Sequence, residues 1–174
     1  MPSRILRSDD WRVEPLSKTH DRAAFSCGVA ALDNYLKKQA SQDVSKRVSV
    51  CFVLTPEGRT VAGFYTLSQY AVDLAGLPAD LASKLPRYPV VPATLLGRFA
   101  ISRDFRGQRL GEFLLLDALH RCWQHSSQVA SAAVVVDAKD DAAARFYQHF
   151  QFISLPSTPN RLFLPMKTIE EMFV

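Results

Sequence analysis

The sequence has few cysteines and no long apolar run. Its three cysteines, Cys27, Cys51 and Cys122, are widely spaced and form no Cys-x-x-Cys pair, so neither a zinc ribbon nor a disulfide framework is expected. No apolar run approaches the roughly 20 residues that cross a membrane, and the first ten residues lack the apolar core of a secretory signal. The four histidines show no metal-ligand spacing. These absences predict a cytoplasmic protein with reduced thiols, no membrane contact and no metal site.

The length of the chain limits how many domains it can form, and its charge indicates which partners it can bind. With 174 residues and 48% hydrophobic content, it is large enough for a single domain over residues 1–174 with its own core. The net charge is +4 and the pI is about 9.1, which is mildly basic. Partial clustering of the basic residues fits a polyanionic partner or a solvated face equally well. The clustered residues are Lys37, Lys38, Lys46, Arg47, Arg98, Arg103, Arg106 and Arg109.

Hydrophobic periodicity predicts alternating strands and helices. Strands are expected at residues 11–16, 48–54, 61–72, 93–101, 132–137 and 161–166, and helices at 29–42, at 77–85, from near Gly107 and at 142–150. The second and third strands should form an antiparallel hairpin. The strand at 132–137 is apolar throughout and should be central, whereas Pro165 favours an edge position for the last strand. The pattern indicates an α+β fold with a mixed sheet.

The most informative stretch is an arginine- and glycine-rich loop between the strand at 93–101 and the helix that follows. The first N–H groups of a helix lack intrahelical partners and favour negative charge. Gly107 and Gly111 let a ligand approach the backbone closely. Arg103, Arg106 and Arg109 supply charge and donors suited to phosphate. The loop therefore predicts an anion site, and a basic surface loop without a ligand is the alternative.

Two segments carry a resemblance to a known family. The first, Arg106-Gly-Gln-Arg-Leu-Gly111, is similar to the pyrophosphate loop Gln/Arg-x-x-Gly-x-Gly/Ala of the GCN5-related N-acetyltransferases (GNAT), with Arg109 where the family usually has Gly. The segment from Ala144 to Phe152 is similar to their Ala-x-x-Phe-Tyr-x-x-x-Gly-Phe segment, with Gln151 where Gly is usual. The resemblance implies the GNAT fold, a mixed and mostly antiparallel sheet flanked by helices and splayed at the acetyl-CoA site.

A narrower resemblance extends from about residue 15 to the C-terminus. Residues 25–36, 42–43, 63–68 and 95–101 are similar to segments of the acetyltransferase toxins of type II toxin–antitoxin pairs. That resemblance implies an acetyl-CoA-dependent N-acetyltransferase that acetylates the α-amine of aminoacyl-tRNA and inhibits translation. It also implies a ribbon–helix–helix antitoxin, which binds operator DNA within the complex, and a homodimer.

The same resemblance implies roles for individual residues. Tyr147 is the expected general acid that protonates the departing CoA sulfur. The strand end formed by Phe99, Ala100 and Ile101 is expected to pair with the pantetheine arm and to polarise the thioester. The pyrophosphate is expected on the backbone N–H groups of Arg106, Gly107, Gln108, Arg109, Leu110 and Gly111. The candidates for tRNA phosphate contacts are Lys37, Lys38, Lys46, Arg47, Arg87 and Arg98.

The sequence contains no obvious strong base for the acceptor amine. The pKa of an α-amino group is about 7.7–8.0, so a fraction of such amines is neutral at cellular pH, whereas the pKa of a lysine side chain is about 10.4. The absence of a base therefore favours an α-amine acceptor. Two other interpretations stay open: an acetyltransferase that acts on a small amine or a protein N-terminus, and a catalytically silent acetyl-CoA-binding domain.

Overall fold

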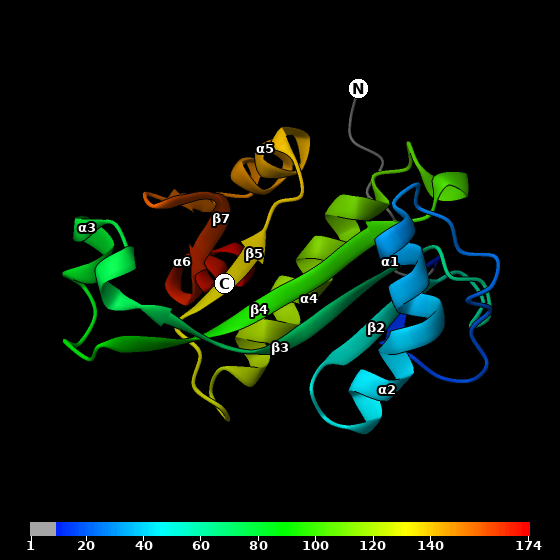
Figure 1. The fold of residues 1–174 in the computed structure, drawn as a ribbon, viewed down its shortest axis with the longest axis horizontal. Helices are drawn as coiled ribbons and strands as arrows, with labels where there is room; N and C mark the ends of the chain where they lie inside the picture. Colours follow the sequence, from blue (N-terminus) through cyan, green and yellow to red (C-terminus); the bar gives the residue numbers. More distant parts are fainter. Residues whose placement is uncertain (1–9) are drawn as a thin grey trace. The chain divides into compact units, whose positions relative to one another are not determined.

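A computed structural model describes residues 10–174, so the expected absence of a signal sequence concerns a segment that lies largely outside them. The strands form one seven-stranded sheet in the order β1-β2-β3-β4-β5-β7-β6. They are β1 (Arg12–Pro15), β2 (Val50–Thr55), β3 (Gly63–Asp73), β4 (Val90–Ile101), β5 (Ala133–Asp137), β6 (Ile153–Leu155) and β7 (Thr158–Pro165) (Figure 1).

The helices are α1 (Ala30–Asn34), the π-helix η1 (Tyr35–Gln39), α2 (Ala40–Ser45), the 3-10 helix η2 (Leu74–Gly76), α3 (Ala79–Ala82), the 3-10 helix η3 (Arg103–Phe105), α4 (Leu110–His125), α5 (Asp141–His149) and α6 (Met166–Phe173). The predicted α+β fold with a mixed sheet flanked by helices is confirmed. None of the helices within residues 10–174 combines the length and apolar character needed to span a bilayer.

The chain divides into two compact units. Unit 1 comprises the described part of Met1–Ser68 together with Arg98–Ala118, and unit 2 comprises Gln69–Gly97 together with Leu119–Val174. The predicted organisation as a single domain over residues 1–174 stays a prediction.

Unit 1 is built on antiparallel strands and the N-terminal helices. β2 pairs antiparallel with both β1 and β3, which confirms the predicted hairpin. Glu57 closes its turn by accepting the N–H groups of Arg59 and Thr60. α1 and α2 lie beside β2 (Figure 1), and the apolar side chains of this segment join the strands in one core cluster. Its buried members include Phe25, Tyr35, Leu36, Val53, Phe64 and Ala100.

Unit 2 holds the parallel strand pair and the C-terminal strands. β4 and β5 pair in parallel over Thr94–Leu96 and Val134–Val136. β7 pairs antiparallel with β5 and with β6. The residues of β5 from Ala133 to Val136 are fully buried, which confirms the predicted central strand.

The predicted edge position of the last strand is wrong, because β6 lies beyond β7 and forms the edge. Pro165 is the final residue of β7, where a missing N–H interrupts the ladder least. The next N–H, of Met166, donates to the carbonyl of Ala132 at 2.8 Å. The strand can therefore be central although it contains a proline.

Several helix boundaries differ from the sequence-based expectation. The helix expected at 29–42 contains a π-helical turn, in which the N–H of Ala40 donates to the carbonyl of Tyr35. The extra residue in that turn lets Tyr35, Leu36 and Ala40 all face the core. α4 begins at Leu110 instead of near Gly107, because Gly107 and Arg109 have φ values of 80° and 58° that a right-handed helix excludes. β6 and α6 had no counterpart in the expectation.

Candidate functional site

The arginine- and glycine-rich loop leaves the end of β4 and is fastened to the N-terminal segment of unit 1. The N–H of Ser102 donates to the carbonyl of Ala62 at 2.8 Å, and the N–H of Arg103 donates to the carbonyl of Ser26 at 2.8 Å. η3 follows, and α4 starts at Leu110. The strand–loop–helix arrangement that the sequence predicts is therefore present, with the loop held at its first residues.

Two of the predicted phosphate-binding arginines use their side chains within the protein. The guanidinium of Arg106 donates to the carbonyl of Cys27. The guanidinium of Arg103 lies against Gly28, where an added Cβ would meet one of its nitrogens at 2.9 Å. These contacts hold the loop in place, and the exposed side chains of Gln108 and Arg109 lie further along it.

The middle of the loop offers backbone donors beside open space. The N–H groups of Gly107, Gln108 and Arg109 make no hydrogen bond to any residue from 10 to 174. A Cβ built at Gly107 would have no atom within 4 Å. Free N–H groups in consecutive residues at a helix N-terminus form a concave anion site. The segment therefore fits the diphosphate of acetyl-CoA.

The conformation of Arg109 explains why glycine is usual at its position in the resembling family. Arg109 has a φ of 58°, in the left-handed region that glycine adopts without steric cost. Its carbonyl accepts the N–H of Phe113 at 3.3 Å and so begins the hydrogen-bond ladder of α4. Arg109 thus adopts the backbone conformation that glycine would have at this position, with some backbone strain.

The strand end before the loop is partly built into the core. Ala100 is buried in the same cluster as Phe25 and Phe64. A Cβ at Gly63 on β3 would come within 2.9 Å of the carbonyl oxygen of Ala100, so this glycine permits a close approach of the backbones. Phe99 and Ile101 alternate with Ala100 and are half-buried.

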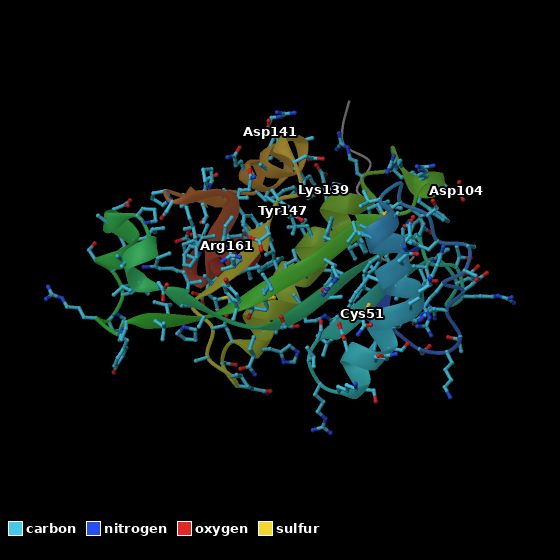
Figure 2. All side chains as sticks on the ribbon, viewed as in Figure 1. Cys51, Asp104, Lys139, Asp141, Tyr147 and Arg161 are labelled. Carbon is cyan, nitrogen blue, oxygen red and sulfur yellow. The ribbon has the colours of Figure 1, made fainter. Side chains whose placement is uncertain are left out.

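Tyr147 lies on α5 in unit 2 (Figure 2). The carboxylate of Asp140 caps the N-terminus of this helix by accepting the N–H of Ala143 at 2.8 Å. Tyr147 is 7% exposed, and its ring lies 5.4 Å from the ring of Phe152. Burial raises the pKa of Tyr147 above its ordinary value. The phenol therefore stays protonated at high pH, as a proton donor requires.

A Schellman motif ends α5 and fixes the position of Tyr147 in it. The N–H of Phe152 donates to the carbonyl of Tyr147 at 3.2 Å, and the N–H of Gln151 donates to the carbonyl of Gln148 at 3.0 Å. Gln151 has a φ of 73°, which this motif requires at its C′ residue. The position at which the resembling family has glycine thus again has a left-handed backbone.

Gln151→Gly should raise the free energy of unfolding by about 0.5 kcal/mol, because glycine adopts positive φ without the steric cost that other residues carry. For a chain of this length the gain corresponds to about 1–2 °C in melting temperature, which differential scanning calorimetry resolves. Arg145→Gly, at an exposed position inside α5, is the control and should lose about 1 kcal/mol. A lower melting temperature for Gln151→Gly would contradict the strain assigned to this residue.

The predicted nucleic-acid-binding residues are divided between the two units. Lys37 and Lys38 are exposed on η1, and Lys46 and Arg47 are exposed just after α2. Arg98 is half-buried near the end of β4 in the same unit. Arg87 belongs to unit 2. Unit 1 therefore contains five of the six candidates.

Sequence reasoning missed the surroundings of Arg98. Its guanidinium carbon lies 3.7 Å from the ring centroid of Tyr35. The π-helical turn that begins at Tyr35 gives no signal in the apolar periodicity. No group of three or more His, Cys, Asp or Glu side chains suited to a metal ion occurs in the part of the chain that is described.

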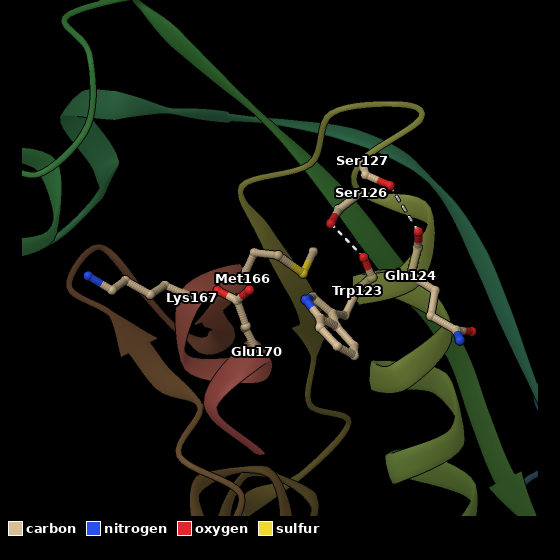
Figure 3. Close-up of a pocket in the computed structure, with 7 residues that line it drawn as sticks. All are labelled: Trp123, Gln124, Ser126, Ser127, Met166, Lys167 and Glu170. Carbon is tan, nitrogen blue, oxygen red and sulfur yellow. Dashed lines mark hydrogen bonds between the residues drawn. The ribbon is translucent and has the colours of Figure 1, made fainter. Parts of the chain in front are cut away.

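Unit 2 also contains an open groove between the end of α4 and α6 (Figure 3). Trp123 and Met166 supply its apolar wall, and the rest of its lining is Gln124, Ser126, Ser127, Lys167 and Glu170. Ser126 donates to the carbonyl of Trp123 at 2.7 Å. The groove contains none of the residues predicted for the site.

Sequence comparison relates the chain to one enzyme family. The profile described as the acetyltransferase (GNAT) family matches residues 10–152. A tRNA-acetylating toxin of Mycobacterium tuberculosis is 39% identical over 152 residues, covering 87% of this chain and 90% of that protein. A probable toxin TacT of Sinorhizobium fredii is 32% identical over 169 residues, covering 92% of this chain and 93% of that protein.

Solved structures of similar toxins match nearly the whole chain. AtaT complexed with acetyl-methionyl-tRNAfMet is 31% identical with a TM-score of 0.88, covering 95% of this chain and 100% of that one. AtaTR bound with acetyl-CoA is 32% identical with a TM-score of 0.83, covering 95% and 99%. A tyrosine-to-phenylalanine mutant of AtaT bound to the C-terminus of the antitoxin AtaR is 30% identical with a TM-score of 0.81, also covering 95% and 99%.

Proposed function

The chain belongs to the acetyltransferase (GNAT) family, and from that premise we propose that it is the toxin of a type II toxin–antitoxin pair. Its reaction is the acetylation of the α-amine of aminoacyl-tRNA by acetyl-CoA, which blocks use of that tRNA in translation. The observation that carries the proposal is similarity over 95% of the chain to a toxin, AtaT, whose structure holds acetyl-methionyl-tRNA. The site of action is the cytoplasm, where charged tRNA is used.

The acetyl donor is held by backbone groups of unit 1. The free N–H groups of Gly107, Gln108 and Arg109 bind the diphosphate, with Leu110 and Gly111 continuing into the helix N-terminus. The strand end from Phe99 to Ile101 pairs with the pantetheine arm. Bound acetyl-CoA supplies the activated acyl group, and an N–H donor of the strand polarises its carbonyl.

The acyl transfer needs one proton donor and an uncharged amine. The acceptor nitrogen attacks the thioester carbonyl carbon, the carbon–sulfur bond breaks, and the phenol of Tyr147 gives its proton to the leaving sulfur. The amine proton passes to water, and the phenolate regains a proton from solvent. The raised pKa of Tyr147 supports this role, and an α-amine with a pKa near about 7.7–8.0 needs no strong base.

The partner is a ribbon–helix–helix antitoxin, and the toxin forms a homodimer. Support for an antitoxin partner comes from AtaT, solved with the C-terminus of AtaR, and support for DNA in the complex comes from the KacTA–DNA complex, which is 27% identical with a TM-score of 0.78. The ribbon–helix–helix type and the homodimer follow from the family resemblance alone. Light scattering of the toxin alone and with its antitoxin measures both stoichiometries. A monomer at micromolar concentration would contradict the dimer.

The function is tested by acetyl transfer from labelled acetyl-CoA to a panel of aminoacyl-tRNAs. Uncharged tRNA, lysine-containing peptides, free peptide N-termini and polyamines serve as competing acceptors. We expect label only on charged tRNA, as N-acetyl-aminoacyl-tRNA. Label on a peptide N-terminus or a small amine, with none on tRNA, would instead identify the protein as an acetyltransferase of small amines or protein N-termini.

Binding of tRNA should weaken steeply with salt if the exposed basic residues of unit 1 contact phosphates. Each neutralised phosphate contributes about −0.7 to −0.9 to the slope of log K against log salt. Lys37→Gln combined with Lys38→Gln should reduce that slope by up to about 2, measured by fluorescence anisotropy. Lys139→Gln with Lys167→Gln makes the same charge change at exposed positions of unit 2 and should leave the slope unchanged. Equal slopes for both pairs would remove Lys37 and Lys38 from the interface.

A further inference from the structure

Arg98 is held in place by an aromatic ring that is itself fixed in the core. The guanidinium carbon lies 3.7 Å from the ring centroid of Tyr35, a distance at which the cation and the ring attract each other. Tyr35 is 8% exposed, and its ring is nearly parallel to that of Phe64, at 14° and 6.4 Å between centroids. The platform under the guanidinium is therefore rigid.

The hydroxyl end of Tyr35 is fixed as well. It donates to Oδ2 of Asp43 at 2.8 Å, while the side-chain amide of Gln39 donates to Oδ1 of Asp43 at 2.9 Å. Burial, and then the bond to Asp43, raise the pKa of Tyr35 to about 12. The hydrogen bonds from Gln39 and Tyr35 lower the pKa of Asp43. At neutral pH the pair is thus a neutral phenol bound to a charged carboxylate.

Tyr35 and Gln39 belong to the π-helical turn η1, and Asp43 belongs to α2. A π turn is an uncommon structure that occurs often at functional sites. Here it brings Tyr35 and Leu36 into the core, while Lys37 and Lys38 of the same turn remain exposed. One short segment therefore both anchors Arg98 and presents positive charge.

Within residues 10–174, the N–H donors of the Arg98 guanidinium have no hydrogen-bond partner. The guanidinium also makes no ion pair with any residue in that range, although Asp43 lies near enough for the positive charge to lower the pKa of its carboxyl. The side chain is half-buried, so it remains accessible. An arginine whose conformational freedom is already lost, but whose fork of N–H groups is free, is preorganised for a phosphate.

The position of Arg98 on β4 indicates which phosphate it would meet. It lies on the same face of the strand as Ala100, which packs toward Phe25 and Phe64. It precedes by one residue the segment 99–101 that is proposed to hold the thioester. A phosphate there belongs either to the end of the acceptor strand of tRNA or to acetyl-CoA itself.

We propose that Arg98 binds a phosphodiester near the aminoacylated 3′ end of the tRNA, and that Tyr35 and Asp43 are positioning residues that hold its guanidinium. The proposal rests on the proposed function. The exposed lysines on η1 favour the longer polyanion over the cofactor, because they lie on the same segment as the anchor of Arg98.

Arg98→Gln should raise KM for aminoacyl-tRNA about tenfold and reduce the salt slope of tRNA binding by about 0.7–0.9, with KM for acetyl-CoA unchanged. Arg59→Gln removes the same charge at an exposed turn of unit 1 and should alter neither quantity. An unchanged salt slope for Arg98→Gln would overturn the proposal. A rise in KM for acetyl-CoA alone would assign the residue to the cofactor and overturn it equally.

The positioning residues are tested by variants that keep the ring or the acceptor atoms. Tyr35→Phe keeps the platform and loses only the bond to Asp43, so KM for aminoacyl-tRNA should rise about threefold while kcat and the salt slope stay unchanged. Asp43→Asn keeps an acceptor for the phenol and should resemble the wild type more closely than Asp43→Ala does. Equal KM values for wild type, Tyr35→Phe and Asp43→Ala, with melting temperatures also measured, would remove the positioning role.

The experiments distinguish a failure of the proposed tRNA acetylation from a failure of the role proposed for Arg98. Salt-dependent binding is measured with both charged and uncharged tRNA and needs no turnover. A wild-type protein that binds tRNA but acetylates none of the panel would refute the proposed reaction. A protein that acetylates tRNA normally in the Arg98→Gln form, with the wild-type salt slope, would refute the inference alone.

Discussion

Tyr147→Phe should lower kcat for acetyl transfer by about 10²- to 10⁴-fold, the usual contribution of a general acid. The substitution removes only the hydroxyl oxygen. The ring contacts with Phe146 and Phe152 remain, so the protein should stay folded. Steady-state kinetics with labelled acetyl-CoA measure the effect. KM for acetyl-CoA should stay within about threefold, because the proposed diphosphate site is the backbone of residues 107–109 in the other unit.

The control for this substitution is Tyr88→Phe, at a tyrosine that is 70% exposed. It should leave kcat unchanged. In cells, expression of the wild type and of Tyr88→Phe should arrest growth, whereas Tyr147→Phe should not. A Tyr147→Phe enzyme that keeps more than about a tenth of the wild-type kcat would exclude the phenol as the acid.

The pH profile of the wild type follows from the same group. Because its pKa is raised, Tyr147 stays in the protonated, proton-donating form to a higher pH than an ordinary tyrosine, whose pKa is about 10. The acceptor α-amine becomes neutral as the pH passes about 7.7–8.0. The rate should therefore rise through pH 8 and hold a plateau to about pH 9.5. A falling limb between pH 8 and 9 would show that another group donates the proton.

Gly107→Val should raise the Kd for acetyl-CoA about 10- to 100-fold. A hydrogen bond to a charged group contributes about 1.5–3 kcal/mol, and a branched side chain in the open space at Gly107 would displace the diphosphate from the loop N–H groups. The φ of 80° adds backbone strain for valine. Isothermal titration of acetyl-CoA measures the loss well below the melting temperature.

Gly76→Val is the matched control, because a Cβ at Gly76 also meets no atom within 4 Å and its φ lies outside the left-handed range. It should bind acetyl-CoA as the wild type does. Wild-type affinity in Gly107→Val, with the fold confirmed by circular dichroism, would move the diphosphate away from this loop.

The main strands and helices could be predicted because local patterns agree with the tertiary contacts. The strand at 132–137 is apolar at every position, and the structure buries it at the centre of the sheet. The loop from Arg106 to Gly111 combines glycines and a following apolar stripe, and a helix does begin at Leu110. Both features depend on residues close together in the sequence.

The features that could not be predicted from the sequence depend on contacts between residues far apart in the chain or on a single backbone angle. Pro165 tolerates a central strand only because it is the last residue of β7, which no local pattern reveals. Arg109 and Gln151 stand at positive φ, although neither residue type signals it. The stacking of Arg98 on Tyr35 joins residues more than 60 positions apart. Such contacts become visible only when the chain is folded.

The burial of the three cysteines has a practical consequence for labelling. Burial raises the pKa of Cys51 on β2 to about 12 (Figure 2), and the thiolate is the form that reacts with alkylating reagents. Maleimides at neutral pH should therefore leave the native thiols unmodified. A single cysteine introduced at an exposed position such as Lys37 would then be a unique attachment point for a fluorophore or photo-crosslinker, without prior removal of the native ones.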